Sequence, residues 1–204
     1  MKPGFSSLTP DEPAPVAQSN VGAFNFIIRP AQTKDLTGMA EILADSFHPP
    51  TGGMRWAYPL LRMGIYEDLR SRLRSTSPNQ ICLVAISQAT PQNLEYLAGT
   101  VEMALRSPPA WSKRNAYLYI SNLAVRRSCR RQGVAQKLLL ACGQTALKWG
   151  FKDIYLHVLE NNHQARRLYL KAGYQVKEIE PSFSFLFLRQ PRRLFLHKHL
   201  ELLA

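Results

Sequence analysis

The chain has 204 residues, enough to bury the hydrophobic core of one domain. Its formal net charge is +12, with 26 lysines and arginines against 14 aspartates and glutamates, a balance that attracts anionic ligands. Hydrophobic residues make up 46% of the chain, but no apolar run approaches the roughly 18 residues of a membrane span, so the sequence predicts no membrane association.

Residues 1–23 form a segment that we expect to be a disordered tail. They include four prolines and show no hydrophobic periodicity. The segment lacks the apolar core of a secretory signal, and its acidic residues are atypical of a transit peptide. The three cysteines are an odd number without metal-ligand spacing and suit a reducing compartment. The sequence therefore predicts one domain over residues 24–204, a cytoplasmic location and no bound metal.

The first half of this domain alternates between strand and helix patterns. Residues 24–29 predict a strand, and residues 33–47 place apolar side chains at helical spacing. Residues 54–74 predict a second helical region, so dense in apolar side chains that we expect most to pack in the core, although some could face a substrate pocket. Residues 81–87 and 96–105 predict a β-hairpin, in which Gly99 indicates a bulge.

The second half predicts the remaining strands of a mixed α/β sheet. Residues 117–125 predict a strand, which is followed by a basic turn with Gly133 and by a helix that stops at Gly150. Residues 154–159 predict the next strand, and we expect Asn162 to cap a short helix that runs to about Lys171. Residues 176–180, 183–189 and 193–199 predict two or three final strands.

The turn after the strand at 117–125 is strongly basic. It contains Arg126, Arg127, Arg130 and Arg131 next to Gly133, and no acidic residue occurs between residues 103 and 152. The first N–H groups of a helix have no intrahelical partner and carry partial positive charge, and a glycine lets a ligand approach the backbone. This arrangement predicts an anion-binding site. A solvated basic turn, or general attraction to nucleic acid, would give the same charge pattern.

Two blocks around this turn resemble one enzyme family. The segment Asn122-Leu123-Ala124-Val125, followed by Arg130-x-x-Gly133-x-Ala135, resembles the pyrophosphate-binding motif of the GNAT superfamily of acetyl-CoA-dependent N-acetyltransferases. The other diagnostic block of that family is similar to Asn162-x-x-Ala165-x-x-Leu168-Tyr169, followed by Ala172-Gly173-Tyr174. Together the blocks span residues 117–174. They resemble cyanobacterial and plastid members and the ribosomal-protein N-terminal acetyltransferases.

The resemblance implies the GNAT fold over residues 24–204. In this fold a mixed central sheet of about six or seven strands is flanked by about four helices. The two central parallel strands, here 117–125 and 154–159, splay apart in a V. Acetyl-CoA is expected to bind in this opening.

The resemblance also implies roles for residues around the opening. Backbone groups of Leu123, Ala124 and Val125 would pair with the pantetheine arm, which Asn162 would also contact. Successive backbone amides would hold the pyrophosphate, namely those of Arg131, Gln132, Gly133, Val134, Ala135 and Gln136. Arg130 and Arg131 would add positive charge.

Acetyl transfer requires one group that protonates the leaving thiolate and one that deprotonates the amine. Tyr169, in the second block, is the expected general acid. The ribosomal-protein branch has a glutamate twelve residues before this tyrosine, where the present chain has His157. An imidazole titrates near neutrality and could accept the proton directly or through water. Glu102, or a water oriented by Ser121 or Asn122, stays open as an alternative.

The acceptor amine is open at the level of sequence. A protein lysine, a protein N-terminus and an arylalkylamine all present a primary amine, and the aromatic-rich residues 56–66 could line an apolar amine pocket. We expect a monomer or a homodimer. A non-catalytic acetyl-CoA sensor with the same fold and a basic nucleic-acid-binding module are the alternative classes. Residues 126–137 contain no aromatic side chain on which bases could stack, which disfavours nucleic acid as a partner.

Overall fold

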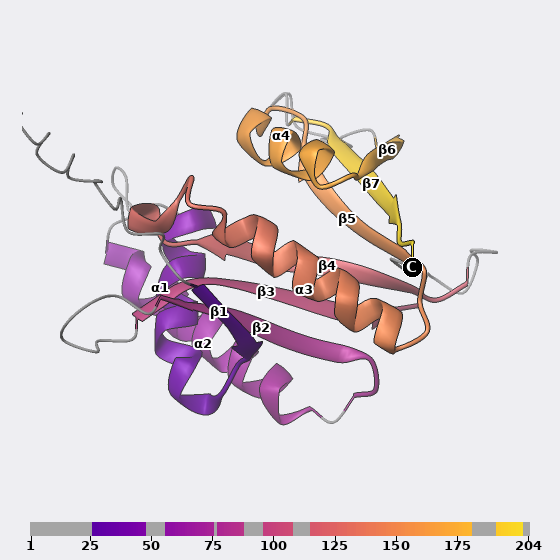
Figure 1. Ribbon diagram of the computed structural model, residues 1–204. Coiled ribbons are helices and arrows are strands. Elements are labelled where there is room, and N and C mark those ends of the chain that lie inside the picture. The colour runs from indigo at the N-terminus through magenta and orange to yellow at the C-terminus, as the bar shows by residue number, and fades with distance from the viewer. Residues whose placement is uncertain are drawn as a thin grey trace, which may run out of the picture.

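The computed structural model describes residues 26–47, 56–75, 77–87, 96–107, 115–180 and 191–201. Its strands are β1 (Phe26–Pro30), β2 (Gln80–Ser87), β3 (Tyr96–Arg106), β4 (Tyr117–Val125), β5 (Asp153–Leu159), β6 (Gln175–Glu180) and β7 (Arg193–His199). They form one seven-stranded sheet in the order β1-β2-β3-β4-β5-β7-β6 (Figure 1). Within it β4 and β5 run parallel, and all other neighbours are antiparallel. The predicted mixed α/β sheet is therefore confirmed.

Four α-helices cover the two faces of this sheet (Figure 1). They are α1 (Leu36–Phe47), α2 (Tyr58–Arg74), α3 (Val134–Lys148) and α4 (His163–Lys171). On one face, Leu138 of α3 and Tyr169 of α4 belong to the same core as Leu118 of β4. On the other face, α1 packs in a second core with Val84 of β2 and Ala124 of β4. The sheet thus separates α3 and α4 from α1 and α2.

β4 and β5 diverge soon after they pair. Their parallel register joins Leu118 to Ile154 and Tyr119 to Tyr155, and it goes no further along either of these two described strands. β5 instead pairs with β7 along its whole length. The edge of β4 beyond Tyr119 therefore has backbone groups that no described strand satisfies. This is the V-shaped splay that the family resemblance implies (Figure 1).

A bulge interrupts β4 in its second half. Asn122 and Leu123 lie opposite the single residue Val101 of β3, and Asn122 has a left-handed φ of 55°. An extra residue reverses the alternation of side chains between the two faces of a sheet. Tyr119, which faces away from the α3 core, therefore shares a face with Ala124 although the two are five positions apart.

The bulge predicted at Gly99 is present one residue earlier, because Ala98 is the extra residue of β3 opposite β2. Gly99 is required for a different reason. A Cβ at this position would lie 2.9 Å from the carbonyl oxygen of Ala124 and 3.1 Å from Cγ1 of Val134. Glycine thus lets the first turn of α3 pack directly on β3 and β4, which fixes the helix N-terminus beside the end of β4.

The expectation that residues 54–74 pack mostly in the core is wrong for the first half of α2. Trp56, just before α2, is 80% exposed, and Leu60 and Met63 within it are 71% and 63% exposed, whereas Leu69 is 1% exposed. α2 packs mainly against α1, along one stripe of side chains. The apolar side chains on its other sides therefore remain in solvent.

Three further expectations concern segments near the chain ends, the start of the first helix and membrane-spanning helices. The predicted tail at 1–23 and the predicted strand at 183–189 lie outside the described residues. The helix predicted from residue 33 begins with the short 3-10 turn Thr33–Asp35 and becomes α-helical at Leu36. None of the described helices is long and apolar enough to cross a membrane.

Candidate active site

A cavity of about 560 Å³ lies where β4 ends and α3 begins, with α4 on its other side. It brings together most of the residues assigned from the sequence. These are Leu123, Ala124, Val125, Arg130, Arg131, Gly133, Val134, Ala135, Gln136, Asn162 and Tyr169. Two assigned residues, Gln132 and His157, do not line it.

The turn before α3 has the backbone conformation of an anion-binding site. Arg131 and Gly133 both adopt left-handed φ angles, of 66° and 81°, and such turns point successive N–H groups into one concavity. The hydrogen bond from Lys137 N to Gly133 O opens the helix, so the three amides before Lys137 have no intrahelical partner. A Cβ on Gly133 would meet no atom of the described residues within 4 Å. Both the donors and the space for an anion are present.

Two side chains of this turn hold it in place. Arg130 donates from Nε to the carbonyl oxygen of Val125 at 3.1 Å, which ties the turn to the end of β4. Gln132 donates from Nε2 to the carbonyl oxygen of Ser128 at 3.0 Å. Its Oε1 is buried and accepts no hydrogen bond within the described structure. The side chain of Gln132 therefore braces the turn and does not line the cavity.

Sequence analysis missed the contribution of α4 to the cavity's charge. Arg167 and Lys171 line the cavity from this helix, together with Gln164 and Leu168. The signal was available, because positions 164, 167, 168 and 171 have the spacing of one helix face. From α1, Phe47 adds an apolar wall that no sequence pattern indicated.

Asn162 and Tyr169 are placed by α4. The Asn162 side chain accepts a hydrogen bond from Ala165 N at 3.0 Å, so the predicted N-cap is confirmed. Tyr169 is buried, with its ring edge-on to that of Tyr174. Burial, and to a smaller extent the neighbouring Tyr119, raises the pKa of Tyr169 to about 12. Tyr169 therefore carries its proton at neutral pH.

His157 lies on the opposite face of the sheet from α4. Its Nδ1 is 2.9 Å from the hydroxyl of Tyr119, and its Nε2 is 2.9 Å from Oε1 of Glu180. Burial lowers the pKa of His157, and the hydrogen bond that its Nε2 donates to Glu180 offsets part of this effect. The imidazole is therefore neutral at neutral pH. Tyr119 and Glu180 were not singled out from the sequence, because only the fold brings these two residues next to His157.

The alternative base, Glu102, is occupied by other side chains. Its carboxylate accepts hydrogen bonds from Nη1 of Arg72 at 2.9 and 3.0 Å and from Nδ2 of Asn122 at 2.9 Å. Glu102 is also almost completely buried. Because Asn122 donates to Glu102, its side-chain amide is already engaged. Of the two side chains expected to orient a water, only Ser121 is outside this network.

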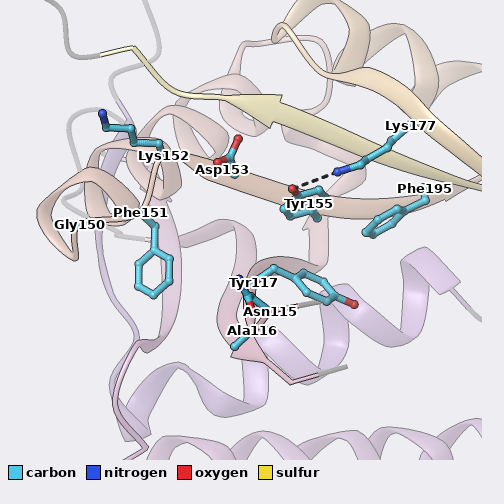
Figure 2. Close-up of a pocket in the computed structure, with 10 residues that line it drawn as sticks. All are labelled: Asn115, Ala116, Tyr117, Gly150, Phe151, Lys152, Asp153, Tyr155, Lys177 and Phe195. Atoms are coloured by element: carbon cyan, nitrogen blue, oxygen red, sulfur yellow. Dashed lines mark hydrogen bonds between the residues drawn. The ribbon is translucent and has the colours of Figure 1, made fainter. Parts of the chain in front are cut away.

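A second hollow lies at the opposite end of β4 and β5 from the basic turn (Figure 2). Rings of Tyr117, Tyr155 and Phe195 line it, and Tyr155 stacks on Phe195 with 5.2 Å between centroids. Lys177 donates from Nζ to the Tyr155 hydroxyl at 3.3 Å. The hollow adjoins Tyr119, whose ring packs edge-on to Tyr117. It is an aromatic surface with a cation at its margin.

The described residues contain no cluster of three or more His, Cys, Asp or Glu side chains that could hold a metal ion. Cys82, Cys129 and Cys142 are buried free thiols. Burial raises the pKa of Cys82 and Cys142 to about 12, so both remain protonated. These cysteines serve as small core residues.

Comparisons with known sequences agree with this geometry. Residues 37–174 match the model of the acetyltransferase (GNAT) family. A protein of Arabidopsis thaliana, GCN5-related N-acetyltransferase 10, chloroplastic, is 30% identical over 175 residues. The match covers 80% of this chain and 67% of that relative, so the chain spans about two thirds of the relative's length.

Solved structures show the same fold. The PaiA N-acetyltransferase from Thermoplasma acidophilum, in complex with coenzyme A, has a TM-score of 0.63 at 18% identity over 86% of this chain and 99% of its own. A ribosomal-protein-alanine N-acetyltransferase from Brucella melitensis has a TM-score of 0.61 at 18% identity over 85% and 99%. Because the family model spans more than half of the sequence, this chain belongs to the GNAT family of acetyltransferases.

Proposed function

We propose that this enzyme transfers the acetyl group of acetyl-CoA to a primary amine, which attacks the thioester carbonyl directly. One observation carries this proposal. All residues assigned to the cofactor from the sequence except Gln132 line a single cavity together with Tyr169, although they come from three elements separated along the chain. Membership of the GNAT family supports the same reaction.

The cavity fits a ligand with a pyrophosphate and an extended arm. Free amides at the start of α3 and the open space at Gly133 would accept the pyrophosphate. The cavity carries positive charge on two sides, from Arg130 and Arg131 of the turn and from residues 167 and 171 of α4. The unpaired edge of β4 would bind the arm through its amides, as a strand adds to the edge of a sheet.

Acetyl-CoA supplies a thioester that an amine can attack without another cofactor. Tyr169 would protonate the leaving thiolate, because it is buried in the cavity wall and protonated at neutral pH. Backbone N–H groups on the unpaired edge of β4 would donate to the oxyanion. The proton of the amine must leave by another group, since Tyr169 is already protonated.

The acceptor that the site supports best is a primary amine carried on an aromatic or apolar group, such as an arylalkylamine. The supporting observation is the aromatic hollow of Figure 2, which adjoins Tyr119 at the end of the splay opposite the cofactor cavity. Packing of the acceptor against the ring of Tyr117 would orient its amine toward the vertex of the V. A protein N-terminus or lysine beside an aromatic residue would present the same group.

We place the enzyme in a reducing compartment, either a cytoplasm or a plastid stroma. The three described cysteines are free and buried, and the Arabidopsis relative is a chloroplastic protein. A monomer or a homodimer is the assembly that we expect.

The reaction can be tested with a panel of amines and two matched tyrosine variants. We expect the wild type to acetylate an arylalkylamine faster than a lysine peptide. Tyr169→Phe should lower kcat by about 100-fold, the typical loss for a general acid, with little change in the KM of acetyl-CoA. Tyr174→Phe removes the hydroxyl of the adjacent buried ring and should keep kcat within about twofold.

Two outcomes would contradict the proposal. If the wild type binds acetyl-CoA but acetylates no amine, the sensor alternative replaces the enzyme. If Tyr169→Phe keeps the kcat of the wild type, Tyr169 is not the acid.

A further inference from the structure

Three polar side chains form a continuous hydrogen-bonded chain at the vertex of the splay. They are Tyr119 of β4, His157 of β5 and Glu180 of β6, with 2.9 Å at each of the two links. The register between β4 and β5 ends at Tyr119, so the first link joins the two strands where they diverge. This position is the inner end of the opening that the cofactor arm is expected to enter.

Tyr119 and Tyr169 lie on opposite sides of this vertex. Tyr169 belongs to the core beneath α3, whereas the side chain of Tyr119 alternates away from that core. The two rings are nevertheless near enough that Tyr119 contributes to the raised pKa of Tyr169. Tyr169 lines the cofactor cavity, and Tyr119 lies on the other face of the sheet, from which we expect the amine to arrive.

We propose that Tyr119, His157 and Glu180 form a relay that removes the proton of the acceptor amine, a role that rests on the acetyl transfer proposed above. As the C–N bond forms and the C–S bond breaks, an N–H proton of the amine passes to the oxygen of Tyr119. The hydroxyl proton of Tyr119 passes at the same time to Nδ1 of His157. The imidazolium then releases its Nε2 proton through Glu180 to water, and exchange with water moves the remaining ring proton from Nδ1 back to Nε2. Tyr169 gives its proton to the thiolate and regains one from water.

Each member has the property that this relay requires. Burial raises the pKa of Tyr119, so its hydroxyl cannot act as a base unless it passes its own proton onward. His157 can receive that proton because burial lowers its pKa and keeps the imidazole neutral. The carboxylate of Glu180 is 40% exposed, so it provides an outlet to solvent.

Charged groups on neighbouring strands tune His157 in opposite directions. Glu180 of β6 raises the pKa of the imidazole, whereas Arg193 of β7 and Arg106 of β3 lower it. Arg106 also lies over the ring of Tyr119, with 3.7 Å from Cζ to the centroid. In the proposed relay Tyr119 contacts the amine, and His157 and Glu180 act through it.

The relay can be tested through substitutions that remove a proton carrier while leaving the size of the side chain nearly unchanged. Tyr119→Phe and His157→Gln should each lower kcat by about 100-fold, and the double variant should be no slower than the slower single variant, because groups that act as one unit are not additive. Calorimetric affinity for acetyl-CoA should stay at the wild-type value in all three. Tyr174→Phe provides the control for loss of a buried hydroxyl.

The pH profile separates the relay from a structural role. The acidic limb of kcat/KM should move to lower pH in Glu180→Gln, which removes the group that raises the pKa of His157. It should move to higher pH in Arg193→Gln, which removes a group that lowers it. The titration of the amine itself is the same in every variant, so differences between variants report the enzyme. Glu180 and Arg193 are partly exposed, so both variants should fold.

Failure of the relay differs from failure of the proposed function. If the wild type acetylates amines and Tyr119→Phe keeps the full kcat, the relay is contradicted but the proposed acetyl transfer is not. Profiles of Glu180→Gln and Arg193→Gln that coincide, or losses in Tyr119→Phe and His157→Gln that multiply in the double variant, would also overturn it. A wild type that acetylates no amine overturns both.

Discussion

The carboxylate of Glu102 is held by side chains from two other elements. Arg72 reaches it from α2 and Asn122 from the bulge of β4. A buried carboxylate with charged and polar partners stabilises the fold only as long as those partners remain. Glu102 therefore joins α2 to the sheet. The contact lies beside the β4 bulge, next to the residues of β4 that line the cofactor cavity.

Replacement of Glu102 separates this structural role from a role as base. Glu102→Gln should lower the free energy of unfolding by about 2 kcal/mol, because Arg72 loses one of its two charged partners, although Asp68 and the solvent exposure of Arg72 limit the loss. The kcat of the folded variant should stay within about twofold of the wild type. Urea denaturation and steady-state kinetics measure the two quantities. A large loss of kcat at unchanged stability would identify Glu102 as the base.

At the scale of elements, α2 and α3 use their apolar residues differently. α3 buries Val134, Leu138 and Cys142 against the sheet, at the spacing of one helix face. α2 packs mainly against α1 along one stripe, so Leu69 is buried while Leu60 on the same helix is exposed. Apolar density along a helix therefore does not decide which of its side chains enter the core.

A pair of identical substitutions in α2 measures this difference. Leu69→Ala should lower the free energy of unfolding by about 3 kcal/mol, through lost burial and the cavity left behind. Leu60→Ala should change it by less than about 0.5 kcal/mol, because the side chain is already in water. Urea denaturation of both variants gives the values. Equal losses would show that Leu60 is covered in solution.

At the scale of the whole molecule, the strands and helices with clear periodicity could be predicted from the sequence. The strand at 117–125, the following helix and the cap at Asn162 all depend on local patterns. The order in which β7 inserts between β5 and β6 could not be predicted, because strand order depends on tertiary packing. The bulge of β4 could not be predicted either. It moves the side chain of Ala124 to the other face of the sheet, and no glycine or proline in the strand indicates it.

The candidate site also has one part that could be predicted from the sequence and one part that could not. The cofactor residues lie in two contiguous blocks, so the family resemblance could assign them from the sequence alone. The Tyr119–His157–Glu180 chain joins three strands that are distant in sequence, and only the sheet brings these residues together. His157 could be identified from its position twelve residues before Tyr169 in the sequence, but its hydrogen-bond partners could not be identified in this way.

The central claim is that the start of α3 binds the pyrophosphate of acetyl-CoA, and Gly133 and Gly150 offer a matched test. They lie at opposite ends of α3, with φ angles of 81° and 82°, and a Cβ on either would meet no described atom within 4 Å. Gly133→Asp and Gly150→Asp therefore introduce the same charge and the same backbone strain, and only Gly133 lines the cofactor cavity.

The decisive measurement is a calorimetric titration of acetyl-CoA into the wild type and both variants at moderate salt. We predict that the wild type and Gly150→Asp bind with similar affinity. Gly133→Asp should bind at least about 100-fold more weakly, because its carboxylate lies where the pyrophosphate is expected. No binding heat from the wild type, or equal affinities for the two variants, would contradict the account.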